Sequence, residues 1–304
     1  MNAIETFNLS RRYGRLEAVH DLTLSVPAGC VFALLGPNGA GKTTTIKVLM
    51  NLLAASAGSA RVLGVDSRKL GEAHYAQIGY VSENQQLPLW MTVRQLLDYC
   101  RPFYPTWDRD LERRLLDQFA LPAERKLKQL SRGMLMKAAL LSSLAYRPRL
   151  LVLDEPFTGL DPLVRDEFIH GVLEVSALGD WTVFVSSHDI AEVERLCDWV
   201  AMLDAGRLRL AEAAESLLGR FRRIEVDLRE GAARLENPPA AWLELQRAGN
   251  RVSFVDSRYA SATTDAACAE RFPGGAVTAQ PLTLREIFVV LARAYRDGGK
   301  GAAA

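Results

Sequence analysis

The feature that most constrains this chain is a glycine-rich segment at residues 36–43, which reads Gly-Pro-Asn-Gly-Ala-Gly-Lys-Thr. An apolar run at 31–35 precedes it, and a helix-compatible stretch at 42–50 follows it. The spacing G-x-x-x-x-G-K-T between a strand and a helix is that of a phosphate-binding P-loop. Glycines let the backbone turn sharply, so that its N–H groups and the helix N-terminus surround a phosphate. The pattern therefore predicts a nucleotide-binding α/β fold.

The expected roles within this loop follow from residue type. Lys42 would reach the outer phosphates of a bound nucleotide, and the hydroxyl of Thr43 would bind Mg²⁺. The backbone N–H groups would supply the remaining contacts. The candidate nucleotide-binding residues of the loop are consecutive: Gly36, Pro37, Asn38, Gly39, Ala40, Gly41, Lys42, Thr43 and Thr44.

The composition limits the classes of protein to which the chain can belong. Its 304 residues leave room for one large domain with an appendage or for two domains. Lysine and arginine total 37 against 36 aspartate and glutamate residues, so no basic excess suggests a nucleic-acid partner. No stretch approaches the roughly 18 apolar residues that a membrane helix needs. The cysteines are widely scattered, which favours a reducing cytoplasm: Cys30, Cys100, Cys197 and Cys268.

Apolar runs and turn signals predict an α/β core. Residues 2–35 alternate roughly as strands do and form a β-rich N-terminal part. The runs 150–153 and 181–185 are apolar almost throughout, as expected for central parallel strands that are covered on both faces. Further short strands are expected at 61–64 and 78–81, with helices of suitable length between the strands.

A segment of helical character at about 88–147 is predicted to be an insertion in this core. Thr92 and Asp108 are suited to cap amphipathic helices, and Ser131 begins another helix. Beyond residue 220 the pattern changes to short strands at 223–228 and 251–255, followed by a helix at 282–295. We therefore expect an α/β domain over 1–220 and a small α+β domain over 221–304, whose role no motif decides.

Further motifs along the α/β part narrow the choice among P-loop proteins. With Tyr13 upstream, they are the loop 130–134 (LSRGM), the carboxylates Asp154 and Glu155 after an apolar run, the segment 159–161 (GLD), and His188 after another apolar run. Together these motifs resemble the nucleotide-binding subunit of an ABC transporter over roughly residues 2–220. The resemblance matches Tyr13 to the A-loop aromatic, 36–44 to Walker A, 130–134 to the signature loop, 150–155 to Walker B with the catalytic glutamate, 159–161 to the D-loop and His188 to the switch histidine.

This resemblance implies a P-loop NTPase (RecA-like) core that hydrolyses ATP with Mg²⁺. Asp154, at the carboxyl end of a buried strand, can hold Mg²⁺ or its waters. Glu155 is placed to accept a proton from the water that attacks the γ-phosphate, or to orient that water. His188 can donate a hydrogen bond to the same phosphate, with Glu155 or Asp161 fixing its tautomer. Tyr13 offers a flat face on which adenine can stack.

The signature loop implies a second cassette, identical to this chain or a paralogue of it. Ser131 and the N–H of Gly133 begin a helix and so form an anion site. In the ABC family this loop faces the P-loop of another cassette, with two ATP molecules between them, and Asp161 of the D-loop belongs to the same interface. A head-to-tail pair with two-fold symmetry closes both sites. An integral membrane permease is the other expected partner, which places the chain at the cytoplasmic face of the inner membrane.

Two positions depart from the common pattern of that family. The signature loop reads LSRGM where LSGGQ is common, so Arg132 adds a positive charge near the partner's ATP. The glutamine expected after 78–81 is replaced by Glu83, whose carboxylate is a third candidate Mg²⁺ ligand beside Thr43 and Asp154. Both departures resemble a subgroup of bacterial exporter-type (ABC-2) cassettes.

Three functions fit these motifs. The first is the ATPase subunit of a transporter, with export favoured by the resemblance, whose spanning helices lie on another polypeptide. The second is a soluble cassette ATPase that acts on DNA or ribosomes, although such proteins usually carry a long coiled coil or two cassettes in one chain. The third is a nucleotide-sensing module with little turnover, against which Glu155 and His188 argue. The transported substrate depends on the membrane subunit and does not follow from this chain.

Overall fold

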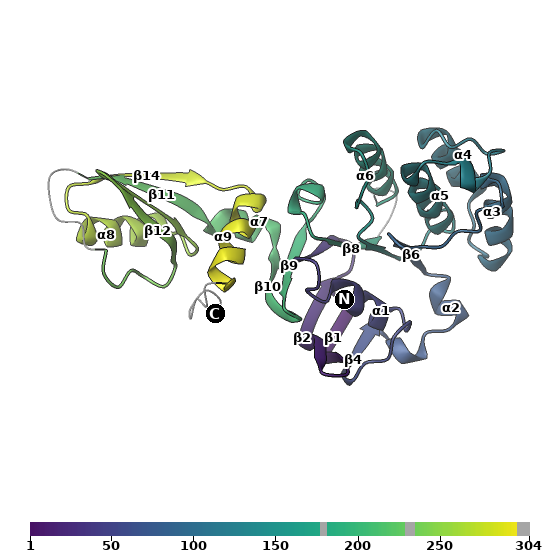
Figure 1. Ribbon diagram of the computed structural model, residues 1–304, viewed down its shortest axis with the longest axis horizontal. Helices are drawn as coiled ribbons and strands as arrows, with labels where there is room; N and C mark the ends of the chain where they lie inside the picture. Colours follow the sequence, from purple (N-terminus) through teal and green to yellow (C-terminus); the bar gives the residue numbers. More distant parts are fainter. Residues whose placement is uncertain (177–180, 229–234, 297–304) are drawn as a thin grey trace. The chain divides into compact units, whose positions relative to one another are not determined.

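The computed structural model describes residues 1–176, 181–228 and 235–296 (Figure 1). Contacts between residues divide the chain into two units, Met1–Ala211 and Glu212–Ala304. The sequence-based division places residues 212–220 with the first part of the chain, whereas the structure groups them with the second unit. None of the helices in the described part of the chain has the length and apolar character needed to span a membrane.

The first unit is built on a six-stranded sheet in the order β10-β9-β3-β8-β7-β6. Its strands are β3 (Val31–Leu35), β6 (Ile78–Ser82), β7 (Leu150–Asp154), β8 (Thr182–Ser187), β9 (Trp199–Asp204) and β10 (Arg207–Ala213). β3 pairs in parallel with β8 and β9, and β7 pairs in parallel with β6 and β8. Every residue of β3, β7 and β8 is buried, which confirms the prediction from their apolar runs.

An antiparallel sheet in the order β2-β1-β4-β5 forms the β-rich N-terminal part. Its strands are β1 (Asn2–Tyr13), β2 (Leu16–Pro27), β4 (Ala57–Val62) and β5 (Val65–Asp66). Buried side chains of this sheet, of the six-stranded sheet and of α1 (Lys42–Leu49) form one apolar cluster. Ala40 of the P-loop belongs to the cluster, so the loop is anchored to the core.

The segment between β6 and β7 is helical, as predicted for an insertion at about 88–147. Its elements are α3 (Val93–Cys100), η2 (Arg101–Phe103), α4 (Arg109–Gln118), η3 (Leu127–Gln129) and α5 (Arg132–Leu144), which lie together in Figure 1. Thr92, Asp108 and Ser131 cap α3, α4 and α5, because each side-chain oxygen accepts a hydrogen bond from a backbone N–H of the first turn. Connections elsewhere in this unit contain η1 (Ser67–Lys69), α2 (Glu72–Tyr75), α6 (Pro162–Ser176) and η4 (Ile190–Glu192).

The second unit contains an antiparallel sheet in the order β12-β13-β11-β14. Its elements are α7 (Ala214–Arg220), β11 (Arg222–Asp227), β12 (Trp242–Ala248), β13 (Arg251–Asp256), α8 (Ser261–Arg271), β14 (Ala276–Pro281) and α9 (Leu284–Arg296). Trp242 stacks on Phe254 with ring centroids 3.9 Å apart, and both belong to one apolar cluster with Cys268 of α8. This unit therefore has an α+β core of its own.

Candidate functional site

The P-loop connects β3 to α1 and needs glycine at two positions. A Cβ atom on Gly36 would lie 2.3 Å from the carbonyl oxygen of Leu203, and one on Gly41 would lie 2.3 Å from that of Ala18. Gly41 also has a φ of 101°, which L-residues with a side chain rarely adopt. The loop backbone can therefore lie tightly against its neighbours, and its curvature follows from the glycines that the sequence motif contains.

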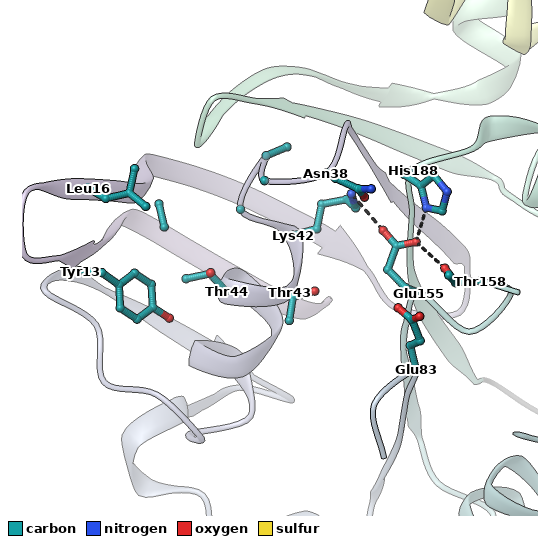
Figure 2. A pocket seen from close by; sticks show the side chains of 14 residues that line it. Tyr13, Leu16, Asn38, Lys42, Thr43, Thr44, Glu83, Glu155, Thr158 and His188 are labelled. Carbon is teal, nitrogen blue, oxygen red and sulfur yellow. Dashed lines mark hydrogen bonds and ion pairs between the residues drawn. The ribbon is translucent and has the colours of Figure 1, made fainter. Parts of the chain in front are cut away.

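Lys42 begins α1, and its ammonium group is enclosed by the loop (Figure 2). Its Nζ donates hydrogen bonds to the carbonyl oxygens of Gly36 at 2.6 Å and Pro37 at 3.2 Å. The same atom lies 3.0 Å from Oε1 of Glu155, and the lysine is only 4% exposed. A buried ammonium needs such partners. The arrangement holds the positive charge between the P-loop backbone and Glu155.

Glu155 is the centre of a cluster of polar side chains (Figure 2). Its Oε2 lies 2.7 Å from Nδ1 of His188 and accepts a hydrogen bond from the hydroxyl of Thr158 at 3.3 Å. Its Oε1 is buried and ion-paired with Lys42. Glu155 has a φ of 51°, and a non-glycine residue in this left-handed region costs about 1–3 kcal/mol. The carboxylate is therefore held between the ammonium of Lys42 and the imidazole of His188.

Asp154 precedes Glu155 at the carboxyl end of β7 and contacts the P-loop. Its Oδ1 accepts hydrogen bonds from the hydroxyls of Thr43 at 3.0 Å and Ser186 at 2.8 Å. A carboxylate beside a P-loop hydroxyl suits Mg²⁺, which usually keeps several waters and binds substrate phosphates. No three His, Cys, Asp or Glu side chains of the described residues form a metal cage. A magnesium ion at this position would therefore depend on nucleotide and water for its other ligands.

The surroundings move the pKa values of these adjacent carboxyl groups in opposite directions. Burial raises the pKa of Asp154, and the hydrogen bonds from Ser186 and Thr43 offset this effect only in part. Burial also acts to raise the pKa of Glu155, but the interactions with His188 and Lys42 outweigh it and the pKa is lowered. Glu155 is therefore ionised at neutral pH, as a hydrogen-bond acceptor for water requires.

One pocket of about 540 Å³ brings many of the predicted site residues together. Its lining includes Tyr13, the loop from Asn38 to Thr44, Glu83, Glu155 and His188. Tyr13 and His188 lie at opposite ends of the view in Figure 2, with Lys42 and Thr43 between them. Gly36, Pro37 and Asp154 do not line the pocket, but they contact Lys42 or Thr43, which do.

The predicted signature-loop and D-loop residues lie outside the described lining of this pocket. The hydroxyl of Ser131 accepts a hydrogen bond from the N–H of Met134 and caps α5. Gly133 lies against Val164, because a Cβ atom there would be 2.6 Å from a methyl group of that valine. Asp161 accepts a hydrogen bond from the N–H of Val164 at 3.0 Å. Glu155 and Asp161 were the two candidates to fix the tautomer of His188. The structure places Glu155 against the ring, whereas Asp161 lies at the start of α6.

The two positions that depart from the common family pattern contact each other. Nη2 of Arg132 donates a hydrogen bond to Oε1 of Glu83 at 2.7 Å. The guanidinium also lies over Gly159, where a Cβ atom would be 3.1 Å from Nη1. The backbone N–H of Glu83 donates to the carbonyl oxygen of Asp154 at 2.9 Å. Nothing in the local sequence patterns indicated that these departures are partners.

Two polar residues of the site were missed by sequence reasoning. Ser186 lies opposite Asp154 in the pairing of β7 with β8, and its hydroxyl also accepts a hydrogen bond from the N–H of Glu155. A serine at the end of an apolar strand was the available signal, because neighbouring parallel strands end at the same edge. Thr158 lines the pocket and donates to Glu155, and no sequence pattern singled it out.

The site combines a P-loop with an adjacent pair of carboxylates and a histidine that contacts one of them, all on a sheet with parallel central strands. These features define the class of this protein as a P-loop ATPase. A family model described as ABC transporter matches residues 19–158. An uncharacterized ABC transporter ATP-binding protein from Synechocystis sp. is 33% identical over 245 residues, which cover 76% of this chain and 68% of that protein. The Nod factor export ATP-binding protein I of Rhizobium leguminosarum bv. viciae is 38% identical over 216 residues, which cover 69% of this chain and 68% of that protein.

Among solved structures, the ATP-binding subunit of an ABC transporter superposes with a TM-score of 0.64 and 30% identity, over 71% of this chain and 91% of that one. The chain belongs to the ABC transporter family as an ATP-binding subunit. It has the P-loop NTPase fold of that family and is an ATPase coupled to transport. ATP-binding subunits of this kind dimerise and work with a membrane permease.

Proposed function

We propose that this chain hydrolyses ATP to drive export through a separate membrane permease. The observation that supports hydrolysis most directly is the position of Glu155, whose carboxylate lies 3.0 Å from Nζ of Lys42 and 2.7 Å from Nδ1 of His188. Export is proposed because a relative at 38% identity is named as a Nod factor export protein. The substrate of this chain's own transporter is a property of the permease.

In this proposal each residue of the pocket has a separate task. Lys42 binds the outer phosphates of ATP and offsets their charge. Glu155 orients the attacking water and accepts its proton, while its Oε2 holds His188. His188 approaches the γ-phosphate from its side of the pocket, and Tyr13 stacks on the adenine. The backbone N–H groups of 38–44 surround the phosphates.

Mg²⁺ is the proposed metal ion, because hydroxyl and carboxylate oxygens face each other beside the loop. Thr43 and Asp154 would hold it, and Glu83, which lines the same pocket as Thr43, is a third candidate. When bound, the ion would offset the negative charge on the phosphates and help to position them.

The dimer is proposed to be a head-to-tail pair with a second cassette, identical or paralogous. Ser131, Gly133 and Asp161 are predicted nucleotide contacts outside the pocket of their own chain, which supports their action on ATP held by a partner.

We place the chain at the cytoplasmic face of the inner membrane, attached through the permease. No nucleic-acid partner is proposed, because the net charge is only +1. Residues 221–304 are proposed to form an accessory domain.

The variant Glu155→Gln tests this function, because the amide keeps the shape of the side chain but loses its basicity. We expect it to bind ATP, to lose most of its turnover, and to accumulate an ATP-bound dimer measurable by light scattering, with the permease present. The matched control is Glu124→Gln, which changes an exposed carboxylate on the helical segment and should hydrolyse ATP normally. Normal turnover in Glu155→Gln, or a chain that stays monomeric with saturating ATP, would contradict the proposal.

A further inference from the structure

The ion pair between Arg132 and Glu83 joins the two residues that depart from the common family pattern. We propose that Arg132 is a positioning residue that neutralises and orients Glu83, so that a carboxylate can stand beside the triphosphate of ATP. The inference rests on the proposed function, because it requires ATP in the pocket that Glu83 lines. It explains the two departures as one compensating change.

The backbone holds Glu83 next to the candidate magnesium site. The residue follows β6 directly, and its N–H donates to the carbonyl oxygen of Asp154 at 2.9 Å. It lines the same pocket as Lys42 and Thr43. An amide at this position would carry no charge, whereas a lone carboxylate would face several negatively charged phosphate oxygens at short range.

Arg132 reaches Glu83 from the helical segment. It is the first residue of α5, directly after the capping residue Ser131. Its guanidinium lies over Gly159, which has a φ of 72° and no side chain to displace it. One guanidinium therefore connects the start of α5 with the end of β6 and the loop after β7.

The charge of Arg132 is suited to this task. Arginine stays protonated at every physiological pH, and its planar group binds a carboxylate in a defined orientation. The Nη2–Oε1 distance of 2.7 Å is that of a charge-assisted hydrogen bond. Together the two side chains are neutral, as an amide would be, but they also connect two loops of the site.

The test is the equilibrium affinity of the full chain for ATP, measured by calorimetry on the slowly hydrolysing background Glu155→Gln. EDTA is present, so that binding of Mg²⁺ by Glu83 does not contribute. Arg132→Gln leaves Glu83 charged and unpaired, so we expect ATP to bind roughly threefold to tenfold more weakly. Adding Glu83→Gln removes the exposed negative charge and should restore the affinity to within about twofold of the parent. Arg132→Lys, which keeps the positive charge, should lose less affinity for ATP than Arg132→Gln does.

The matched control is Arg113→Gln, which removes one positive charge from an exposed surface pair on α4 and should leave the affinity unchanged. The defect of Arg132→Gln should shrink as salt is added, because screening weakens repulsion between Glu83 and the phosphates. If the double variant binds ATP as weakly as Arg132→Gln alone, the inference is overturned, because the loss of affinity would then not depend on Glu83. A parent that binds no ATP would instead overturn the proposed function, and the inference with it.

Discussion

The imidazole of His188 is joined directly to the carboxylate of Glu155, with Nδ1 and Oε2 2.7 Å apart. Because an ionised carboxylate only accepts hydrogen bonds, the ring nitrogen that faces it carries a proton. Nε2 can then donate to a phosphate only when the ring holds a second proton. The contact therefore fixes the orientation of the imidazole ring relative to Glu155.

The first prediction concerns His188→Ala. We expect kcat to fall about a hundredfold, because the variant loses a group that approaches the reacting phosphate and orients Glu155. The hydrogen bond from His188 lowers the pKa of Glu155, so its removal lets that pKa rise. Glu155 then becomes protonated at a higher pH, and the acid limb of the kcat profile should move upward in pH. An acid limb at the same pH as in the parent would show that His188 does not set the pKa of Glu155.

The second prediction concerns Lys42→Ala. The substitution removes a buried cation that pairs with Glu155 and that we propose binds the phosphates of ATP. A charge-assisted hydrogen bond contributes about 1.5–3 kcal/mol, so we expect ATP to bind roughly tenfold to a hundredfold more weakly by calorimetry. Lys128→Ala, at an exposed position of η3, is the control and should bind ATP as the parent does. Unchanged affinity in Lys42→Ala would count against the P-loop assignment.

The third prediction concerns Asp154→Asn. Burial raises the folded-state pKa of Asp154 above its unfolded value, so ionisation costs stability as the pH rises from the acid range toward neutrality. The asparagine removes this cost, and its Oδ1 can still accept from Thr43 and Ser186. Without nucleotide we therefore expect Tm to be equal to or higher than that of the parent. The additional rise in Tm caused by Mg²⁺ with ATP should be lost, and its retention would exclude Asp154 as a ligand.

The fourth prediction concerns Gly41→Ala. The new Cβ would lie 2.3 Å from the carbonyl oxygen of Ala18, and the backbone at this position has a φ of 101°. We expect a loss of about 1–3 kcal/mol in the free energy of unfolding, together with weaker ATP binding. Gly71→Ala is the control, because a Cβ atom there would have no neighbour within 4 Å and its φ is −131°. Equal stability of the two variants in denaturant titrations would contradict the steric argument.

Much of the fold followed from local sequence patterns. The apolar runs that became β7 and β8 were predicted as central strands, because a strand covered on both faces needs apolar residues throughout. Thr92, Asp108 and Ser131 were predicted as caps, since their side chains satisfy backbone N–H groups within the same turn. In the second unit, the predicted strands at 223–228 and 251–255 and the predicted helix at 282–295 are confirmed as β11, β13 and α9. β12, α8 and β14 were not predicted, and the two strands are stabilised by pairing with β13 and β11.

The sequence by itself determined the P-loop, its strand and its helix, because the chemistry of that motif lies within a few consecutive residues. Only the tertiary structure decided that Arg132 pairs with Glu83 and that Ser186 supports Asp154. Those partners are 49 and 32 residues apart along the chain, and no local pattern encodes such a contact. Ser186 meets Asp154 because β7 and β8 are parallel and end at one edge of the sheet. Arg132 meets Glu83 because the fold brings the start of α5 next to the end of β6.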